Sequence, residues 1–167
     1  MTLATIAFVE RNSACFERSL LAGESTPGHI TGSAWVVSTD RQSVLLIHHR
    51  KLDRWLQPGG HADGNPNVAT VALREAQEET GLHSLRLVMG LGGQPSIFDV
   101  DVHGIPALGN VPEHLHYDIR FLAEAEVNEP FGNSDEVKNS QWFTLESLKL
   151  YTDSESILRM VRKSSIN

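Results

Sequence analysis

Three glutamates lie close together in the segment Arg74-Glu75-Ala76-Gln77-Glu78-Glu79. Successive residues of an α-helix are about 100° apart, so spacings of three and four place all three carboxylates on one side of a helix. Like charges at these separations repel by roughly a few tenths of a kcal/mol per pair, and by more when partly buried. The cluster therefore needs a counterion, and oxygen ligands favour Mg²⁺ or Mn²⁺ over zinc. The alternative is an acidic helix face that only contacts solvent.

The element that must position these carboxylates is a helix over residues 67–80. Four residues recur at spacings of four, three and four and share one face: Ala69, Leu73, Ala76 and Thr80. Gly81 predicts the end of this helix. Its start has two possible caps, Asn65 with Pro66 at the first helical position, or Asn67 itself.

Segments rich in apolar and β-branched residues surround the helix and predict strands over residues 33–37, 44–47, 85–91, 97–102, 114–127 and 141–143. The polar residues 38–43 predict a hairpin between the first two strands. Residues 51–65 and 104–112 predict loops. Residues 1–22 predict a helix broken near Asn12 and ended by Gly23, and Thr152-Asp153-Ser154-Glu155 is typical of a capping box before a last helix.

Length and composition limit the class of protein. The 167 residues fit one domain, so we expect a single domain over residues 1–167, with an N-terminal helical extension over 1–25 and a core over 29–150. The net charge of −7 disfavours binding to long nucleic acid. No apolar run approaches the roughly 18 residues that span a bilayer, so we expect no membrane interaction.

Cys15 is the only cysteine, which excludes a disulfide within the chain. Together with the lack of a basic leader before an apolar stretch, it favours a cytoplasmic location. Cys15 is expected to be a buried small residue rather than a nucleophile. The sequence does not indicate an oligomeric state.

The sequence around the glutamates resembles the Nudix family of pyrophosphohydrolases. The family's box, G-x5-E-x7-R-E-apolar-x-E-E-x-G-apolar, maps onto Gly60–Leu82, and six of its seven fixed positions match. Pro66 stands where the family has its first glutamate, and Asp63 is one candidate to replace it. The resemblance covers residues 29–150 and implies an α+β fold: an α/β/α sandwich with a mixed sheet and a central catalytic helix.

The resemblance also implies a metal site. The carbonyl of Gly60 and the carboxylates of Glu75, Glu78 and Glu79 would hold one to three Mg²⁺ or Mn²⁺ ions, and Arg74 would brace the carboxylates. Either Glu75 or Glu78 would act as the general base. The family often adds a carboxylate from a later loop, for which we favour Glu136, with Glu129 and Asp135 as alternatives.

A small diphosphate is the substrate that this family resemblance implies, namely a nucleoside diphosphate linked to another group. Candidate phosphate contacts are Arg50, Lys51 and Arg54 in a basic stretch, and His61 directly after Gly60. Trp55 in the same stretch is expected to pack in its loop rather than stack on a base. The alternatives are a nucleotide or nucleotide-sugar sensor that does not cut its ligand, and a diphosphate isomerase, which would need a cysteine in the catalytic region.

Alternating polar residues mark two of the predicted strands. His114, His116 and Asp118 project from one face and could bind a cation or substrate, although hydrogen-bonded strand histidines are more common. Asp99, Asp101 and His103 repeat this alternation on the preceding strand. The two strands could together line a polar cleft, whereas His29 and His83 suggest only capping or surface roles.

Overall fold

A computed structural model describes residues 2–17, 28–132 and 134–165 of the chain. The strands form one mixed sheet: β1 (Gly28–Ser38), β2 (Ser43–His49), β3 (Arg54–Leu56), β4 (Gly59–His61), β5 (Arg86–Leu87), β6 (Ile97–Ile105), β7 (His114–Ala125) and β8 (Val137–Thr144). The helices are α1 (Thr2–Arg11), α2 (Val68–Thr80), a 3-10 turn η1 (Ser147–Leu150) and α3 (Glu155–Ser164).

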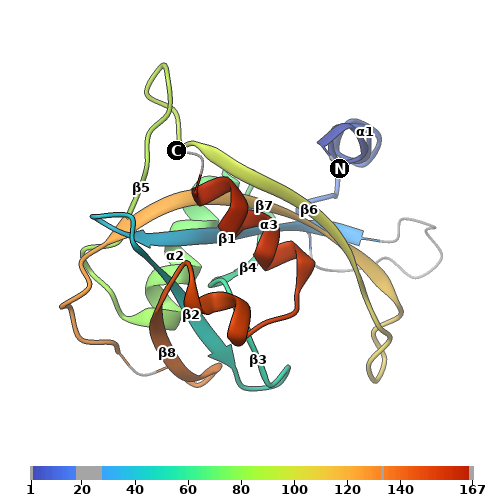
Figure 1. Cartoon of the computed structure of the whole chain (residues 1–167). Helices are drawn as coiled ribbons and strands as arrows, with labels where there is room; N and C mark the ends of the chain where they lie inside the picture. Colours follow the sequence, from blue (N-terminus) through green and yellow to red (C-terminus); the bar gives the residue numbers. More distant parts are fainter. Residues whose placement is uncertain (1, 18–27, 133, 166–167) are drawn as a thin grey trace.

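Strand β1 lies at the centre of the sheet. It pairs in parallel with β7 and antiparallel with β2 and β4, while β5 and β6 pair with β7, and β3 and β8 pair with β2. Parallel neighbours need a long crossover, and the chain between β1 and β7 contains α2. Figure 1 shows α2 behind the sheet and α3 in front of it. The predicted mixed α+β sandwich is therefore confirmed.

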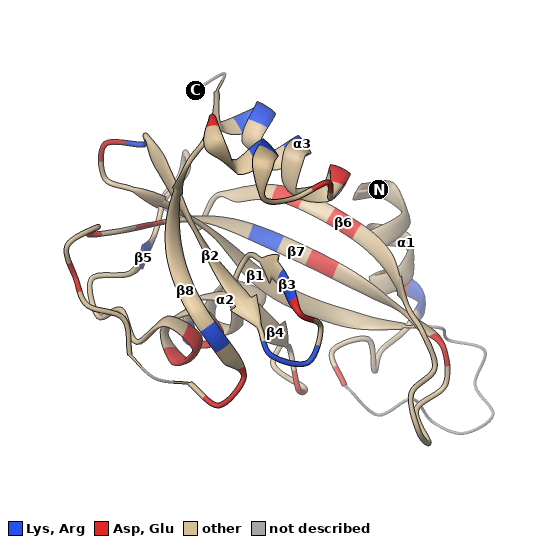
Figure 2. Ribbon diagram, turned by 60° about the horizontal axis from the view of Figure 1, so that its bottom comes forward, with Lys and Arg blue, Asp and Glu red and all other residues tan. Residues whose placement is uncertain are grey.

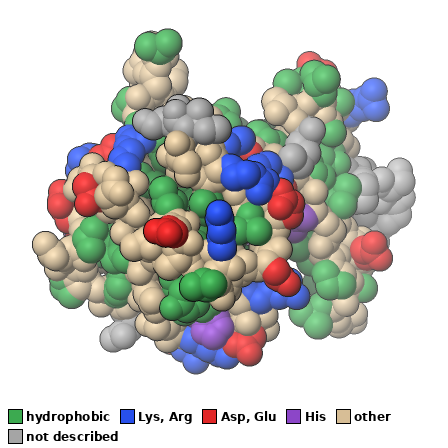
Figure 3. All heavy atoms as spheres, viewed as in Figure 1, with side chains coloured by type: hydrophobic (Ala, Val, Ile, Leu, Met, Phe, Trp, Pro, Cys, Tyr) green, Lys and Arg blue, Asp and Glu red, His purple; other side chains and the backbone are tan. Residues whose placement is uncertain are grey.

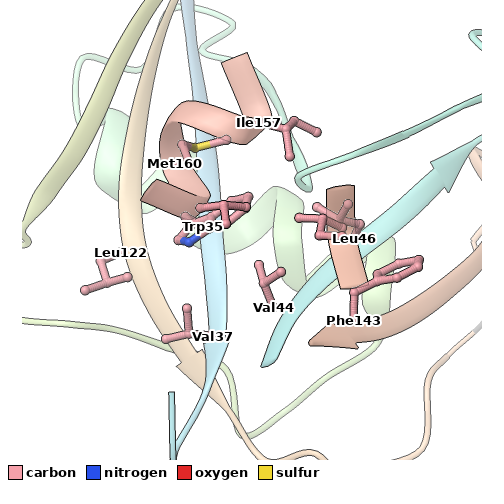
Figure 4. Packing of buried hydrophobic residues seen from close by; sticks show 10 residues of the cluster. Trp35, Val37, Val44, Leu46, Leu122, Phe143, Ile157 and Met160 are labelled. Carbon is pink, nitrogen blue, oxygen red and sulfur yellow. The ribbon is translucent and has the colours of Figure 1, made fainter. Parts of the chain in front are cut away.

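Alternation along β1 builds a separate core on each face of the sheet, because successive side chains point to opposite sides. Ala34 and Val36 pack in a cluster with Ala76 of α2. Trp35 and Val37 pack in the cluster that α3 covers, which Figure 4 shows. All of β1 is buried, which fixes its register. It has no free edge, because strands pair with it on both sides.

The segment before β1 packs against the sheet. The ring of Phe8 in α1 stacks on Tyr117 of β7 with their centroids 3.9 Å apart. Cys15 is 2% exposed, as predicted, and its carbonyl accepts a hydrogen bond from the N–H of Ile30 at 2.7 Å. The predicted break near Asn12 is confirmed, since α1 ends at Arg11. The helix predicted to continue after it is wrong for residues 13–16, which form turns closed by hydrogen bonds between residues three apart, such as Cys15 N–H to the carbonyl of Asn12. The predicted stop at Gly23 lies outside the described residues, and the division into extension and core stays a prediction.

Short elements account for most differences from the predicted strands and loops. The predicted loop over 51–65 is wrong, because β3 and β4 lie within it. Each has three residues, too few for a visible alternation, and exists through pairing with β2 or β1. The predicted strand over 85–91 shortens to β5, and β6 extends to Ile105 into the segment predicted as a loop.

The last helix begins later than the capping-box pattern indicates. Ser154, not Thr152, is the N-cap residue of α3, and its side chain makes no capping hydrogen bond. The hydroxyl of Thr152 instead accepts a hydrogen bond from the N–H of Ser154 at 3.1 Å. The pattern therefore predicts the helix but not its first residue.

On the side of the molecule where α3 lies, the outer surface carries Lys and Arg side chains interspersed with Asp and Glu (Figure 3). In the described part of the chain, no helix has the length and apolar character needed to cross a membrane.

Candidate active site

The ends of α2 are fixed by the residues that flank it. The side chain of Asn67 accepts a hydrogen bond from the N–H of Thr70 at 3.2 Å, so Asn67 is the N-cap and Asn65 lies outside the helix. Gly81 ends the helix with a left-handed φ of 71°, and its N–H donates to the carbonyl of Gln77. These two ends fix which residues of α2 face the sheet.

Glycines let α2 approach β1 and β4 closely. A Cβ atom on Gly32 would lie 2.8 Å from the carbonyl oxygen of Val68, and one on Gly60 would lie 2.4 Å from Cδ of Glu75. Contacts this short would displace the helix or the carboxylate. The two glycines therefore let the Glu75 carboxylate rest directly on the backbone of β4.

Glu79 lies at the most buried position of the acidic cluster. Only 5% of it is exposed, and its Oε2 accepts a hydrogen bond from the N–H of Gly59 at 2.9 Å. Burial raises the pKa of its carboxyl to about 8, and the nearby charges of Glu75, Glu136 and Glu78 act in the same direction. Without a cation, this carboxyl is largely protonated at neutral pH.

Arg74 connects the other two glutamates. Its guanidinium donates to Oε1 of Glu75 at 2.6 Å and to Oε2 of Glu78 at 3.2 Å. Burial raises the pKa of Glu75 although Arg74 opposes the shift, and the carboxylates of Glu78 and Asp63 add to it. Arg74 thus lowers the repulsion on this side of α2 and orients both carboxylates.

The loop before β8 brings a further carboxylate to the cluster. The charge of Glu136 acts to raise the pKa of both Glu79 and His49, so its side chain lies near α2 and near the end of β2. Figure 2 shows acidic residues of α2 and of this loop on the same side of the sheet. Of the two alternatives, Glu129 has its carboxylate bound to the N–H groups of His83 and Ser84, at 2.6 and 3.0 Å.

Arg50 holds this loop in place. Its backbone N–H donates to the carbonyl of Glu136 at 2.8 Å, and its guanidinium donates to the carbonyls of Asp135 and Val137 at 2.8 and 3.1 Å. The three bonds fix the segment on both sides of Glu136. Arg50 therefore acts on the acidic cluster through this loop.

Comparison with known proteins assigns the chain to a family. The NUDIX domain profile matches residues 29–163, which is most of the chain. The chain belongs to the NUDIX family. It is 31% identical over 112 residues to a "Probable DHNTP pyrophosphohydrolase" of Lactococcus lactis subsp. cremoris, covering 65% of this chain and 62% of that protein.

Two further comparisons agree with this assignment. "Nucleoside diphosphate-linked moiety X motif 6" of Xenopus laevis is 33% identical over 87 residues, covering 48% of this chain and 40% of that protein. The crystal structure of a NUDIX-family hydrolase from Clostridium perfringens superposes with a TM-score of 0.63 at 26% identity, covering 81% of this chain and 95% of that one. The matched segments span less than two thirds of both sequence relatives.

The NUDIX box maps onto β4, the following loop and α2. Gly60, the first residue of the box, lies against the side chain of Glu75. Gly81, near the end of the box, has the left-handed conformation that ends α2 and that favours glycine. Pro66, at the position of the first box glutamate, lies exposed just before the N-cap. Asp63 lies near enough to Glu75 to affect its pKa, so a carboxylate is present on this side of the loop.

The candidate substrate residues of this NUDIX domain lie in different surroundings. Lys51 and Arg54 are exposed near the end of β2, whereas Arg50 is bound to the loop described above. A hollow of about 530 Å³ lies beside that loop, with Arg50, Lys138 and Phe131 among its lining residues. Trp55 stacks on His48 and meets Phe143 edge-on, as expected for a packing residue.

The alternating polar residues of β6 and β7 do share one face, because Asp101 pairs with Asp118, and His103 with His116. Their carboxylates form a buried network around Arg120, which donates to Asp99, Asp101 and Asp118 at 3.3, 3.1 and 2.8 Å. Asp118 also accepts hydrogen bonds from Thr31, Ser33 and Gln57. Asp118 is therefore a structural residue rather than a cation ligand.

His61 lies away from the acidic cluster, among histidines. Because Gly60 faces α2, the next side chain on β4 points to the opposite face of the sheet. There the ring of His61 lies 5.0 Å from His29 and 5.1 Å from His116, centroid to centroid. Nothing local in the sequence links His29 to this group, because its place depends on the parallel pairing of β1 with β7.

Proposed function

We propose that this protein is a metal-dependent hydrolase that cleaves the pyrophosphate bond of a nucleoside diphosphate linked to another group. The observation that carries the proposal is the position of Glu75, Glu78 and Glu79 against the glycine backbone of β4, next to the loop of Glu136. A protein that needed only the fold would gain stability by losing this repulsive cluster. Family membership supports the same reaction class.

The donor set fits a hard divalent cation. Every candidate ligand is an oxygen: the carboxylates of Glu75, Glu78, Glu79 and Glu136, and the carbonyl of Gly60. Oxygen donors suit Mg²⁺ and Mn²⁺. The raised pKa of the buried Glu79 carboxyl supports this, because a nearby cation would stabilise its charged form. When bound, such an ion neutralises phosphate oxygens and makes a water molecule a better nucleophile.

The residues of the chain then have distinct roles. Glu75 or Glu78 takes the proton of the attacking water, and Arg74 orients both carboxylates for this. The loop held by Arg50 keeps Glu136 near Glu79. Positioning of the water in line with the P–O bond supplies much of the rate. The products are a nucleoside monophosphate and a phosphorylated remainder.

The hollow beside the Glu136 loop is the proposed place for part of the substrate. Its lining includes the basic residues Arg50 and Lys138, the acidic Asp135 and the apolar Phe131. Lys51 and Arg54 are retained as candidate substrate contacts, whereas His61 points to the face opposite the acidic cluster. A cytoplasmic location, predicted from the single cysteine, is part of the same proposal.

A nucleotide or nucleotide-sugar sensor is the second candidate, because Pro66 replaces the first glutamate of the box. A sensor would keep the hollow and the fold but would not need the repulsion among the glutamates. The two functions predict different outcomes of one experiment.

The test is incubation with Mg²⁺ and a panel that includes dinucleoside polyphosphates, nucleotide sugars and dihydroneopterin triphosphate, followed by chromatography of the nucleotide products. We expect a nucleoside monophosphate from at least one linked diphosphate, with no product when EDTA is present. Tight binding without turnover in the whole panel would instead support the sensor. The Glu78→Gln variant is the control for a contaminating phosphatase.

A further inference from the structure

Five histidines gather on the face of the sheet opposite α2. In the strand register, His29 of β1 lies beside His116 of β7, which lies beside His103 of β6. His114 precedes His116 by two residues and points to the same side. His61 approaches from β4. The group therefore forms from four strands that are distant in the sequence, and it does not belong to the acidic site on the α2 side.

Three of these histidines have the geometry of metal ligands. One ring nitrogen from each of His29, His114 and His116 lies within 4.8 Å of the others. The ring centroids are 4.7, 5.0 and 5.2 Å apart. Nitrogens that bind one tetrahedral ion at about 2.0–2.1 Å lie about 3.3 Å from one another. Nitrogens at the 4.8 Å limit would have to move about 1.5 Å closer to bind one ion together.

The hydrogen bonds of His114 leave one ring nitrogen available to an ion. Its Nδ1 lies 2.8 Å from the carbonyl oxygen of Pro112, and because a carbonyl only accepts, Nδ1 carries the proton. The lone pair is then on Nε2. Histidines that bind metals commonly donate their other N–H to a carbonyl or carboxylate in this way.

The burial of the three rings also favours a bound ion. His29 and His114 are 2% and 5% exposed. Nε2 of His116 is buried and has no hydrogen-bond partner in the described part of the chain. A buried polar atom without a partner destabilises the fold, and a bound ion would satisfy it.

We propose that His29, His114 and His116 bind one divalent transition-metal ion of the kind that prefers imidazole, with Zn²⁺ as the expected ion and His61 as the nearest candidate for a fourth ligand. Imidazole nitrogens suit Zn²⁺, whereas Mg²⁺ prefers oxygen. This site is separate from the oxygen-ligand site of the proposed hydrolase. By joining β1 to β7 it would stabilise the parallel strand pair at the centre of the sheet.

The experiment uses the full chain without a polyhistidine tag, freed of metal by chelation. Co²⁺ is added as the optical probe, since cobalt in a tetrahedral nitrogen site absorbs visible light strongly, and Zn²⁺ is then added as competitor. We expect the strong absorption to saturate at one Co²⁺ per chain and to be removed by one Zn²⁺, because Co²⁺ at the oxygen ligands of the acidic site absorbs only weakly. The Glu79→Gln variant should bind Co²⁺ in the same way, because it alters only the acidic site.

The variants His116→Gln and His114→Gln should each weaken Zn²⁺ binding at least about tenfold. His83→Gln, at an exposed histidine outside the group, is the matched control and should bind as the unchanged chain does. Circular dichroism in EDTA checks that each variant folds.

The proposal is overturned if the unchanged chain does not bind the metal stoichiometrically. It is also overturned if both histidine variants bind Zn²⁺ as tightly as the unchanged chain does. Anomalous diffraction at the zinc edge gives a readout that needs no variant. A peak beside the nitrogens of His29, His114 and His116 supports the site, and a peak only at the glutamates contradicts it.

Discussion

Burial and the neighbouring carboxylates raise the pKa of Glu79, while the hydrogen bond from the N–H of Gly59 lowers it. With a pKa of about 8, the carboxyl is largely protonated at pH 7 in the metal-free protein, and a cation bound at the proposed site would favour its charged form. Glutamine has nearly the same shape as the neutral form. This makes Glu79 the residue at which the requirements of folding and of catalysis can be separated.

For Glu79→Gln we expect loss of activity without loss of the fold. Turnover in saturating Mg²⁺ should fall at least about a hundredfold, because a charged group that stabilises the reacting centre is lost. Thermal stability in EDTA should be unchanged at pH 7 and higher than that of the unchanged chain above about pH 8, because glutamine never carries the buried charge. The exposed Glu113→Gln is the control for both measurements. Near-normal turnover of Glu79→Gln would show that this residue is not a ligand.

The raised pKa of Glu79 also predicts how stability depends on pH. The folded protein holds this proton up to about pH 8, whereas the unfolded chain releases it near 4.5. The contribution to stability is complete below pH 4.5 and is lost as the pH rises to about 8, with a slope of at most about 1.4 kcal/mol per pH unit. In urea unfolding with EDTA, the free energy of unfolding should therefore decrease more steeply with rising pH for the unchanged chain than for Glu79→Gln. Equal slopes would contradict the assigned pKa.

The contact between β4 and α2 depends on a glycine. In Gly60→Ala, the new Cβ would meet the end of the Glu75 side chain, which can move, so we expect the fold to remain. The displaced carboxylate should weaken Mn²⁺ binding about 10- to 100-fold, as for other changes that disturb ligand orientation. Electron paramagnetic resonance of free Mn²⁺ measures this affinity. Gly104→Ala is the matched control, because a Cβ there meets nothing within 4 Å.

The loop of Glu136 depends on Arg50 in a similar way. Arg50→Gln removes the guanidinium bonds to Asp135 and Val137, so Glu136 loses its support and Mn²⁺ affinity should fall several-fold. Lys51→Gln removes an exposed charge next to it and should raise the KM for substrate while Mn²⁺ affinity stays the same. Unchanged Mn²⁺ binding in both variants would indicate that Arg50 contacts only the substrate.

The charged network between the sheet and α3 connects the two halves of the molecule. The Arg120 side chain is 3% exposed, and it donates to three aspartates and to Ser156 of α3. Arg159 and Lys163 of α3 also pair with Asp99. These bonds lower the pKa of Asp99 although burial alone would raise it. The network thus fixes how α3 lies on the sheet.

Arg120→Met should remove this connection while keeping most of the side-chain volume. Buried carboxylates left without their partner cost about 3–5 kcal/mol, and we expect the free energy of unfolding in urea to fall by that amount. Arg162→Met is the control, since Arg162 pairs with Glu155 at the exposed surface, and a change within about 0.5 kcal/mol is expected. A similar small change for Arg120→Met would show that Arg159 and Lys163 suffice.

The sequence alone determined those features that depend on local spacing. The helix over 67–80, its end at Gly81, the hairpin of residues 33–47 and the one-sided glutamates follow from periodicity and from glycine geometry. The family resemblance added the fold. The three-residue strands β3 and β4 were beyond such reasoning, because hydrogen bonds to distant neighbours define them.

Only the tertiary structure decided which residues meet. The parallel pairing of β1 with β7 places His29 beside His116, although 86 positions of sequence separate them in the register His29↔His116. The role of Arg50 in holding the Glu136 loop depends on two backbone carbonyls that no sequence pattern marks. Local patterns report the conformation of a segment, whereas contacts between strands depend on the path of the whole chain.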